Sequence, residues 1–195
     1  MVCRECGALS RSPADGHPGW HQLAGGAWLF RGQEFDDERG HSREIFDLTS
    51  RPEGFEGFVT AQENIVATRA AGCARGMHYQ VPPYAQAKVA TVVKGTAQFF
   101  WVSLREKSAL PQVNSIMLTA GATSLYTPAD CSHGFVAVDH DTRFLLKTSA
   151  PVSLDHRGQV NFLSKSLKFD FACPIREDLL SPRDQNAPEW EMRRQ

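Results

Sequence analysis

Residues 75–80 read RGMHYQ, and residues 88–104 read KVATVVKGTAQFFWVSL. The second stretch predicts two strands, because β-branched and aromatic residues dominate it on both sides of a turn at residues 94–96. The first stretch places His78 between Arg75 and, further along the chain, Lys88. A histidine held on a sheet between two cations suits the removal of a proton from an anionic substrate.

Short apolar or alternating segments continue on both sides of this stretch. Turn residues separate them, and this spacing predicts an all-β fold of the β-sandwich or jelly-roll type. Only the end of the chain, residues 177–194, reads as helical, and Pro182 and Pro188 interrupt it, so we expect short C-terminal helical segments. We interpret residues 35–40 as a charged turn. The further strands that we expect are 27–30, 44–46, 113–118, 124–127, 134–138 and 142–148, while residues 58–64 alternate only weakly.

Length and composition predict one folded domain. The chain has 195 residues, of which 42% are hydrophobic and 22% charged, as is typical of a globular protein. Residues 1–26 lack periodicity, so we expect an irregular N-terminal extension followed by a single domain over residues 27–195. A net charge of −1 gives no overall attraction to nucleic acid or acidic membranes.

The five cysteines are an odd number, which favours reduced thiols. Cys3 and Cys6 form a CxxC pair, but no second pair follows to complete a zinc site, so an irregular segment is the favoured interpretation. No apolar run has the length of a membrane span, and the N-terminus lacks the apolar core of a secretory signal. We therefore expect a cytoplasmic protein.

His78 is the first candidate for a catalytic group. If it lies on a strand, residues at even offsets share its face, which would direct Gln80, Gln86 and Lys88 into one cavity. A single histidine is more often a structural residue, but the nearby cations and a second histidine, His133, favour a site. No carboxylate lies between His78 and Arg105, and two histidines beside Lys88 are too few ligands for a cation, so we expect no metal.

Six motifs follow one another along the chain: DERG at 37–40 with Glu44, QEN at 62–64, RGMHYQVPPYAQAK at 75–88, PADCSHGF at 128–135, FLLKT at 144–148 and LSPRD at 180–184. Together they resemble the dTDP-4-dehydrorhamnose 3,5-epimerase family of nucleotide-sugar enzymes in the cupin superfamily. The resemblance implies a cupin-type jelly roll, a homodimer, a small-molecule nucleotide-sugar substrate, most simply dTDP-linked, and no cofactor.

The same resemblance implies roles for particular residues. His78 matches the base that removes a proton beside a 4-keto group, Asp184 the carboxylate that orients it, and Lys88 the cation that stabilises the enolate. Each residue that matches a substrate contact has an alternative role in a surface or fold-supporting ion pair. This alternative is strongest for Arg39, which follows three acidic residues. The positions that match substrate contacts are Arg39, Glu44, Gln62, Asn64, Arg75 and His133.

One departure from the family concerns the acid on the opposite face of the enolate. The family uses a tyrosine shortly after the Lys-Thr strand, and by spacing that position is Val152 here. Valine cannot donate a proton, so three hypotheses stand. The chain is an atypical epimerase of a nucleotide-linked 4-keto-6-deoxysugar. Alternatively it uses the same enolising groups for isomerisation, dehydration or cyclisation in natural-product biosynthesis. The third hypothesis is a ligand-binding cupin without catalysis, against which the retained His78, Asp184 and Lys88 argue.

Overall fold

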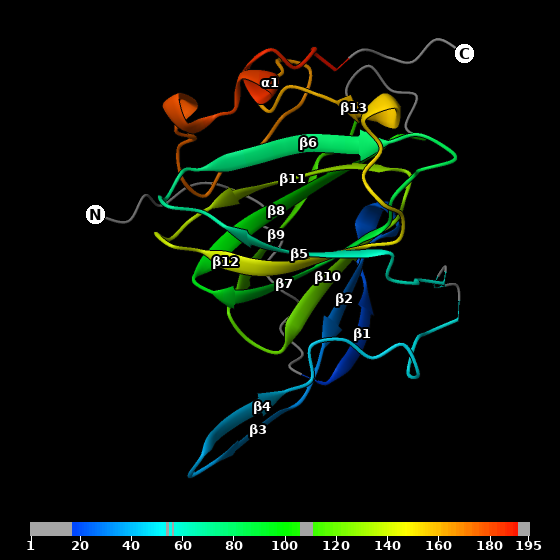
Figure 1. Ribbon diagram of the computed structural model, residues 1–195, viewed down its shortest axis with the longest axis vertical. Coiled ribbons are helices and arrows are strands. Elements are labelled where there is room, and N and C mark those ends of the chain that lie inside the picture. The colour runs from blue at the N-terminus through cyan, green and yellow to red at the C-terminus, as the bar shows by residue number, and fades with distance from the viewer. Residues whose placement is uncertain (1–16, 54, 56, 106–110, 191–195) are drawn as a thin grey trace.

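Two antiparallel sheets pack face to face in the computed structural model, which describes residues 17–53, 55, 57–105 and 111–190 (Figure 1). The six-stranded sheet has the order β1 (Gly19–Gln22), β2 (Trp28–Arg31), β10 (Thr123–Thr127), β7 (Lys88–Lys94), β12 (Arg143–Thr148) and β5 (Gln62–Ala67). The five-stranded sheet has the order β13 (Arg157–Gln159), β6 (Ala74–Gln80), β11 (Cys131–Ala137), β8 (Thr96–Ser103) and β9 (Asn114–Thr119). The predicted all-β sandwich of the cupin type is confirmed.

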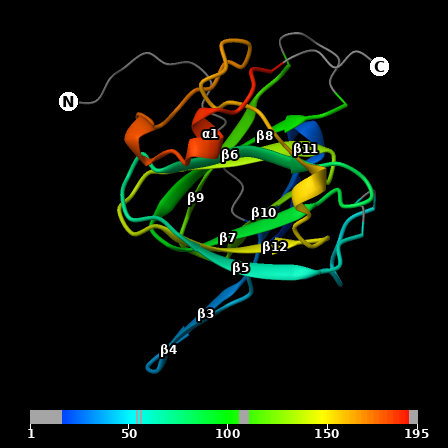
Figure 2. The same ribbon diagram turned by 45° about the horizontal axis from the view of Figure 1, so that its top comes forward.

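A third, two-stranded sheet is formed by β3 (Glu34–Asp37) and β4 (Gly40–Arg43). This hairpin projects away from the sandwich in both views (Figures 1 and 2). The charged turn expected at residues 35–40 is thus the tip of a hairpin with flanking strands. The strand expected at residues 44–46 is wrong, because this segment is irregular and Phe46 is held by ring contacts with Trp20, Phe30 and Phe58 instead of a ladder.

The N-terminal boundary also needs correction. Residues 19–26 are not irregular, since β1 pairs with β2 and a 3-10 turn, η1 (Ala24–Gly26), connects them. Trp20 explains why this short strand forms, because its ring lies 5.1 Å from that of Phe30 and 4.7 Å from that of Phe55. Cys3 and Cys6, and most of the predicted extension, lie outside the described residues. Cys73, Cys131 and Cys173 are free thiols.

The C-terminal segment covers the outer face of the five-stranded sheet (Figure 2). Phe100, Val102 and Val136 of that sheet pack there against Phe162 and Leu167 of the segment. The helix expected over residues 177–194 is limited to η3 (Glu177–Leu179) and α1 (Pro182–Gln185). Pro182 does not interrupt a helix but begins one, because a proline at the first helical position loses no hydrogen bond. This segment therefore delivers α1 to the edge of the sheet beside β6.

A bulge in β6 sets the direction of two side chains. His78 pairs with His133 and Arg75 with Phe135, so three steps on β6 match two on β11. Residues three apart on a regular strand would face opposite sides of the sheet, but here Arg75 and His78 both face the space between the sheets. Gly76 makes this possible, since its φ is +128° and a Cβ atom there would lie 2.6 Å from the Cα atom of Gly134.

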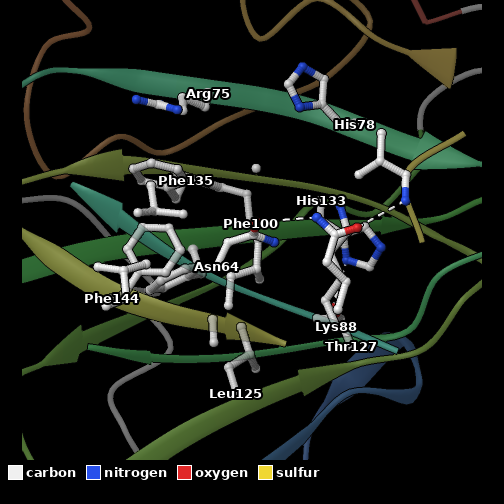
Figure 3. Close-up of a pocket in the computed structure, with 18 of the residues that line it drawn as sticks. Asn64, Arg75, His78, Lys88, Phe100, Leu125, Thr127, His133, Phe135 and Phe144 are labelled. Atoms are coloured by element: carbon white, nitrogen blue, oxygen red, sulfur yellow. Dashed lines mark hydrogen bonds between the residues drawn. The ribbon is translucent and has the colours of Figure 1, made fainter. Parts of the chain in front are cut away.

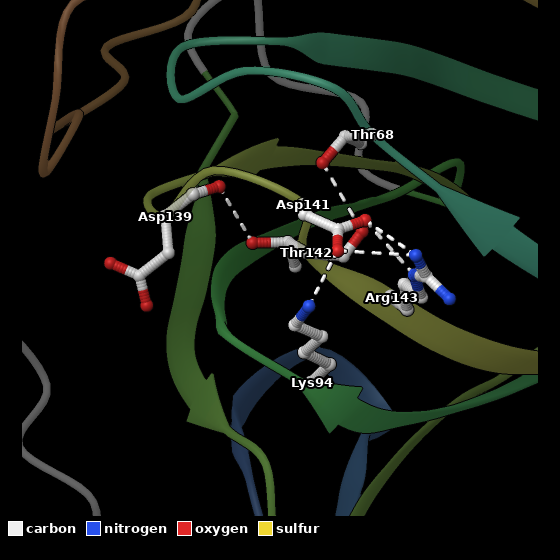
Figure 4. A network of polar contacts seen from close by, with 6 residues as sticks. All are labelled: Thr68, Lys94, Asp139, Asp141, Thr142 and Arg143. Carbon is white, nitrogen blue, oxygen red and sulfur yellow. Dashed lines mark hydrogen bonds and ion pairs between the residues drawn. The ribbon is translucent and has the colours of Figure 1, made fainter.

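At one end of the sandwich, the turn before β12 is fixed by polar contacts (Figure 4). Asp141 accepts a hydrogen bond from Lys94 at 2.5 Å and another from Arg143 Nε at 2.9 Å. The Thr142 hydroxyl donates to the Asp139 carbonyl at 2.8 Å, and the Thr68 hydroxyl donates to the Thr142 carbonyl at 3.2 Å. These contacts connect β12 to β7 and to the segment that follows β5, and so fix the register of the strands that carry the cavity floor.

Candidate active site

A cavity of about 630 Å³ lies between the two sheets (Figure 3). Its floor comes from the six-stranded sheet, whose inward side chains form rows across paired strands. One row is polar and contains Gln62, Thr148, Lys88 and Thr127. The next row contains Asn64, Leu146, Ala90 and Leu125, and beyond it the floor is apolar. A ligand here would have its polar groups near Lys88 and an apolar surface beneath the rest.

His78 projects into the cavity from the opposite sheet, and a carboxylate lies behind it. Its Nε2 atom is 2.6 Å from Asp184 Oδ1. The Ser181 hydroxyl, which caps α1, donates to Asp184 Oδ2 at 2.9 Å. Burial by itself raises the pKa of Asp184, but hydrogen bonds from His78 and Ser181 and the charge of His78 bring it below its ordinary value. An ionised Asp184 fixes Nε2 as the protonated nitrogen, which leaves Nδ1 of His78 as the ring nitrogen that can accept a proton.

Lys88 stands on the floor at the start of β7. Burial, with a smaller contribution from the nearby Arg157 guanidinium, lowers the pKa of Lys88 to about 8. At neutral pH most of this lysine is still an ammonium, but one that releases its proton much more readily than an exposed lysine. Arg157, on β13, lines the same cavity and keeps its charge.

His133 takes part in the site in its neutral form. Burial, followed by the charges of Lys88 and His78, lowers its pKa well below the ordinary value. Its Nδ1 atom is 2.6 Å from the Thr127 hydroxyl, and the backbone of Gln86 accepts a hydrogen bond from the ring. A neutral ring held by these contacts is suited to shape the cavity.

The structure brings most of the predicted site residues together. Gln62, Asn64, Arg75, His78, Lys88 and His133 line the cavity, and Asp184 is in contact with His78. Arg39 and Glu44 do not line the cavity. Arg39 is 90% exposed on the hairpin tip, where it forms an ion pair with Asp37, and Glu44 is exposed beyond the end of β4.

The expectation that Gln80 and Gln86 face the cavity is wrong. The Gln80 amide donates to the carbonyls of Tyr84 and Pro151, at 2.6 and 3.1 Å, and accepts from the backbone of Ser153 at 2.8 Å. Gln86 donates to the Ala150 carbonyl at 2.6 Å. The even-offset rule failed because the prolines after β6 end the strand, and these amides instead hold the loop between β12 and η2 (Leu154–His156) in place.

Val152 is part of that loop and lines the cavity, with its side chain 52% exposed. Leu146, earlier on β12, also lines it. None of the three tyrosines does, since Tyr79, Tyr84 and Tyr126 are all described and none is among the lining residues. No tyrosine is thus among the residues that line the cavity of the described chain.

Two polar lining residues were missed by the sequence analysis, Thr127 and Arg157. Thr127 ends a predicted strand and resembles any β-branched strand residue. Arg157 follows the altered loop, and its pairing with Gln80 on β6 depends on a long-range register that no local pattern reveals. Within the described ranges, no three His, Cys, Asp or Glu side chains converge to hold a metal ion. No helix there is long and apolar enough to cross a membrane.

Comparison with known proteins identifies the family to which this fold and cavity belong. Residues 22–192 match the family described as dTDP-4-dehydrorhamnose 3,5-epimerase. The chain belongs to the dTDP-4-dehydrorhamnose 3,5-epimerase family. It is 31% identical over 166 residues to a dTDP-4-dehydro-6-deoxyglucose 3-epimerase from Streptomyces bikiniensis, and this match covers 84% of each protein.

Solved structures of epimerases share the fold. A dTDP-4-dehydrorhamnose 3,5-epimerase from Elizabethkingia anophelis aligns with a TM-score of 0.78 at 28% identity, covering 89% of this chain and 97% of the other. ChmJ, a 3'-monoepimerase from Streptomyces bikiniensis solved with dTDP-quinovose, aligns with a TM-score of 0.75 at 30% identity, covering 84% and 83%. Relatives named for one epimerisation and for two both resemble this chain, so membership of the epimerase family does not fix which carbon is inverted.

Proposed function

We propose that this chain is an epimerase of dTDP-linked 4-keto-6-deoxysugars, and that His78 removes the proton from a carbon beside the 4-keto group. The observation that carries the proposal is the 2.6 Å contact between His78 Nε2 and Asp184 Oδ1, made by a histidine that lines the same cavity as Lys88. A carbonyl makes the neighbouring C–H bond acidic, and an oriented base with a cation nearby is what enolisation requires. Only protons are exchanged, so the reaction needs no cofactor.

The charges of the cavity support a diphosphate-bearing substrate. Arg75, Lys88 and Arg157 line it, and among the described residues no carboxylate does, although the chain as a whole has a net charge of −1. Such a local excess of positive charge attracts and holds an anion. Arg75 has the planar guanidinium that suits phosphate oxygens, while Gln62 and Asn64 offer amide groups to the hydroxyls of a sugar. The dTDP-sugar relatives named above have substrates of this charge.

The substrate-contact roles of Arg39 and Glu44 stay predictions, and they imply that the protein is a homodimer. Both residues lie outside the cavity of their own chain, on or just after the projecting β3–β4 hairpin. They would contact substrate only if the hairpin entered the cavity of a second copy. We therefore expect a dimer in light-scattering measurements. We also expect Arg39→Ala to raise KM without changing the fold, and a monomeric active enzyme would contradict both expectations.

A second candidate function is favoured by the absence of a tyrosine from the lining residues. His78 and Lys88 could make the enolate while the proton returns to the same face or to the neighbouring carbon, giving exchange without inversion or an isomerised ketone. The first candidate predicts an inverted product, and the second predicts either unchanged stereochemistry or a moved carbonyl.

The test is incubation of the protein with dTDP-4-keto-6-deoxyglucose in D₂O, followed by NMR of the sugar. We expect deuterium at a carbon beside the keto group together with an inverted product, and we expect His78→Ala to abolish both. His140→Ala provides a matched control, because His140 is exposed in the turn before β12, away from the cavity. If the wild-type protein binds dTDP but incorporates no deuterium, the proposal is wrong.

A further inference from the structure

Few groups in the cavity can change their protonation near neutral pH. The amides of Gln62 and Asn64 and the hydroxyl of Thr127 do not ionise there, and arginine does not lose its proton. His133 is held neutral by burial and by the charges of Lys88 and His78, and its Nδ1 atom is in contact with the Thr127 hydroxyl. Among the lining residues of the described chain, which include no tyrosine, cysteine or carboxylate, this leaves His78 and Lys88.

These two groups stand on opposite walls. His78 projects from β6 of the five-stranded sheet, and Lys88 projects from β7 of the six-stranded sheet, with the cavity between them (Figure 3). A flat enolate bound between the sheets would present one face to His78 and the other to Lys88. Inversion of a carbon requires a proton to leave from one face and another to arrive at the opposite face.

We infer that Lys88 is the proton donor to carbon in this epimerase, a role that rests on the proposed function and goes beyond stabilising the enolate. His78 Nδ1 takes the proton, and the electron pair of the broken C–H bond moves into the enolate. The ammonium of Lys88 then gives a proton to the other face of the same carbon, so that an N–H bond breaks and a C–H bond of inverted configuration forms. Lys88 ends as a neutral amine and His78 as an imidazolium, and each returns to its starting state by one proton exchange with water.

The surroundings of Lys88 suit a donor. Burial and the Arg157 guanidinium lower its pKa to about 8, so the neutral amine left after the transfer is tolerated. The charged and titratable groups that face it are Arg157 on β13, His78 on β6 and His133 on β11. All are basic, and none would hold the proton on Lys88 by pairing with it. The enolate oxygen can be bound by Asn64, whose Oδ1 accepts from Gln62 at 3.2 Å, which leaves its NH₂ group to donate.

Lys88→Arg separates the two roles, because arginine keeps the positive charge but cannot release a proton at neutral pH. With dTDP-4-keto-6-deoxyglucose in D₂O, we expect this variant to incorporate deuterium with the original configuration. We expect its inverted product to fall by roughly 100-fold or more, the usual loss when a positioned acid is removed. Lys88→Met should lose both exchange and inversion. Lys94→Arg, on the exposed end of the same strand, is the matched control and should behave as wild type.

A rescue experiment covers the case in which arginine does not fit. In Lys88→Ala, added ethylammonium carries N–H protons into the vacated space, whereas tetramethylammonium brings charge alone. We expect only the first to restore inversion, with thermal melting and dTDP titration verifying that each variant is folded. An inversion-to-exchange ratio unchanged in Lys88→Arg, or restored by tetramethylammonium, would overturn the inference. Wild-type exchange without inversion would overturn it as well, while a wild-type protein without any exchange would overturn the proposed function too.

Discussion

In the proposed mechanism, His78 acts as a base through only one of its ring nitrogens. Nε2 is occupied by Asp184, so the proton abstracted from a substrate must go to Nδ1. The carboxylate contributes orientation and charge: it selects the tautomer and stabilises the imidazolium that forms. At the residue scale, the proposed mechanism therefore depends on Asp184, which is in contact with His78 and is not among the residues that line the cavity.

Asp184→Asn tests this dependence. Asparagine keeps the shape but removes the charge, so we expect kcat for deuterium exchange to fall by roughly 10²–10⁴-fold while KM changes little. Exchange followed by NMR over a range of substrate concentrations gives both constants. The control is Asp178→Asn, since Asp178 is exposed in the same C-terminal segment and pairs with Arg176 at 2.6 Å. Equal activity of the two variants would remove Asp184 from the mechanism.

At the scale of elements, the loop between β12 and η2 forms one wall of the cavity and is held by side-chain amides. Gln80 makes three hydrogen bonds to backbone around this loop, Gln86 makes one, and the Val152 amide donates to Gln62 at 3.2 Å. These bonds replace a β-ladder that the loop does not have. A wall without regular structure is thereby kept in one position relative to His78.

Gln80→Ala is expected to loosen that wall. Gln80 is buried, so its removal leaves backbone groups of Pro151 and Ser153 without partners, at a cost of roughly 1–3 kcal/mol each. We expect a lower free energy of unfolding in urea and a higher KM, with kcat less affected because His78 and Asp184 stay paired. Gln112→Ala, at an exposed position, serves as the control. A Gln80→Ala protein with wild-type stability and KM would show that the loop is held in some other way.

At the scale of the whole molecule, the buried charge of Lys88 lowers the free energy of unfolding. The pKa of Lys88 is about 8 in the folded protein and 10.5 when unperturbed, so below pH 8 its charge is less favourable in the folded state than in the unfolded state. Between these two values the unfolded chain binds more protons, and stability contributed by this group rises with pH.

Lys88→Met should therefore be inactive and more stable. At pH 7 we expect Tm to rise by roughly 2–4 °C, the shift that about 1 kcal/mol produces in a domain of this size. The gap from wild type should shrink as pH rises above 8 and close near 10.5, which calorimetry at several pH values would measure. Lys94→Met, at an exposed and ion-paired position, should change little. A less stable Lys88→Met would show that the lysine charge is not a cost to folding.

Much of the fold could be predicted because the inner strands are rich in β-branched and aromatic residues. β7, β8, β9, β10, β11 and β12 each fall on or within a few residues of a predicted strand. The prediction failed at two kinds of segment. Phe46 packs among aromatic rings from an irregular segment, whereas β1 is a genuine strand of only four residues whose pattern is too short to detect.

Part of the candidate site could likewise be predicted from the sequence, and part could not. His78, Lys88 and Asp184 were identified by family resemblance, and the structure brings them together. Arg75 and His78 share a face only through the bulge at Gly76, which breaks the even-offset rule. The direction of Gln80 and the contribution of Arg157 depend on the path of the chain after β12, and spacing alone could not supply it.

The carboxylate behind the base is separated from it by 106 positions along the chain. When β6 to β13 have been synthesised, the two sheets are therefore nearly complete, but His78 still lacks its partner Asp184. A product of premature termination or proteolysis between Gln159 and Ser181 would keep Arg75 and Arg157 of the cavity and hence its attraction for nucleotide, yet in the proposed mechanism it would be inactive without Asp184. Mixed with intact enzyme, such fragments would compete for substrate, so the integrity of the last stretch of chain governs the activity of the whole preparation.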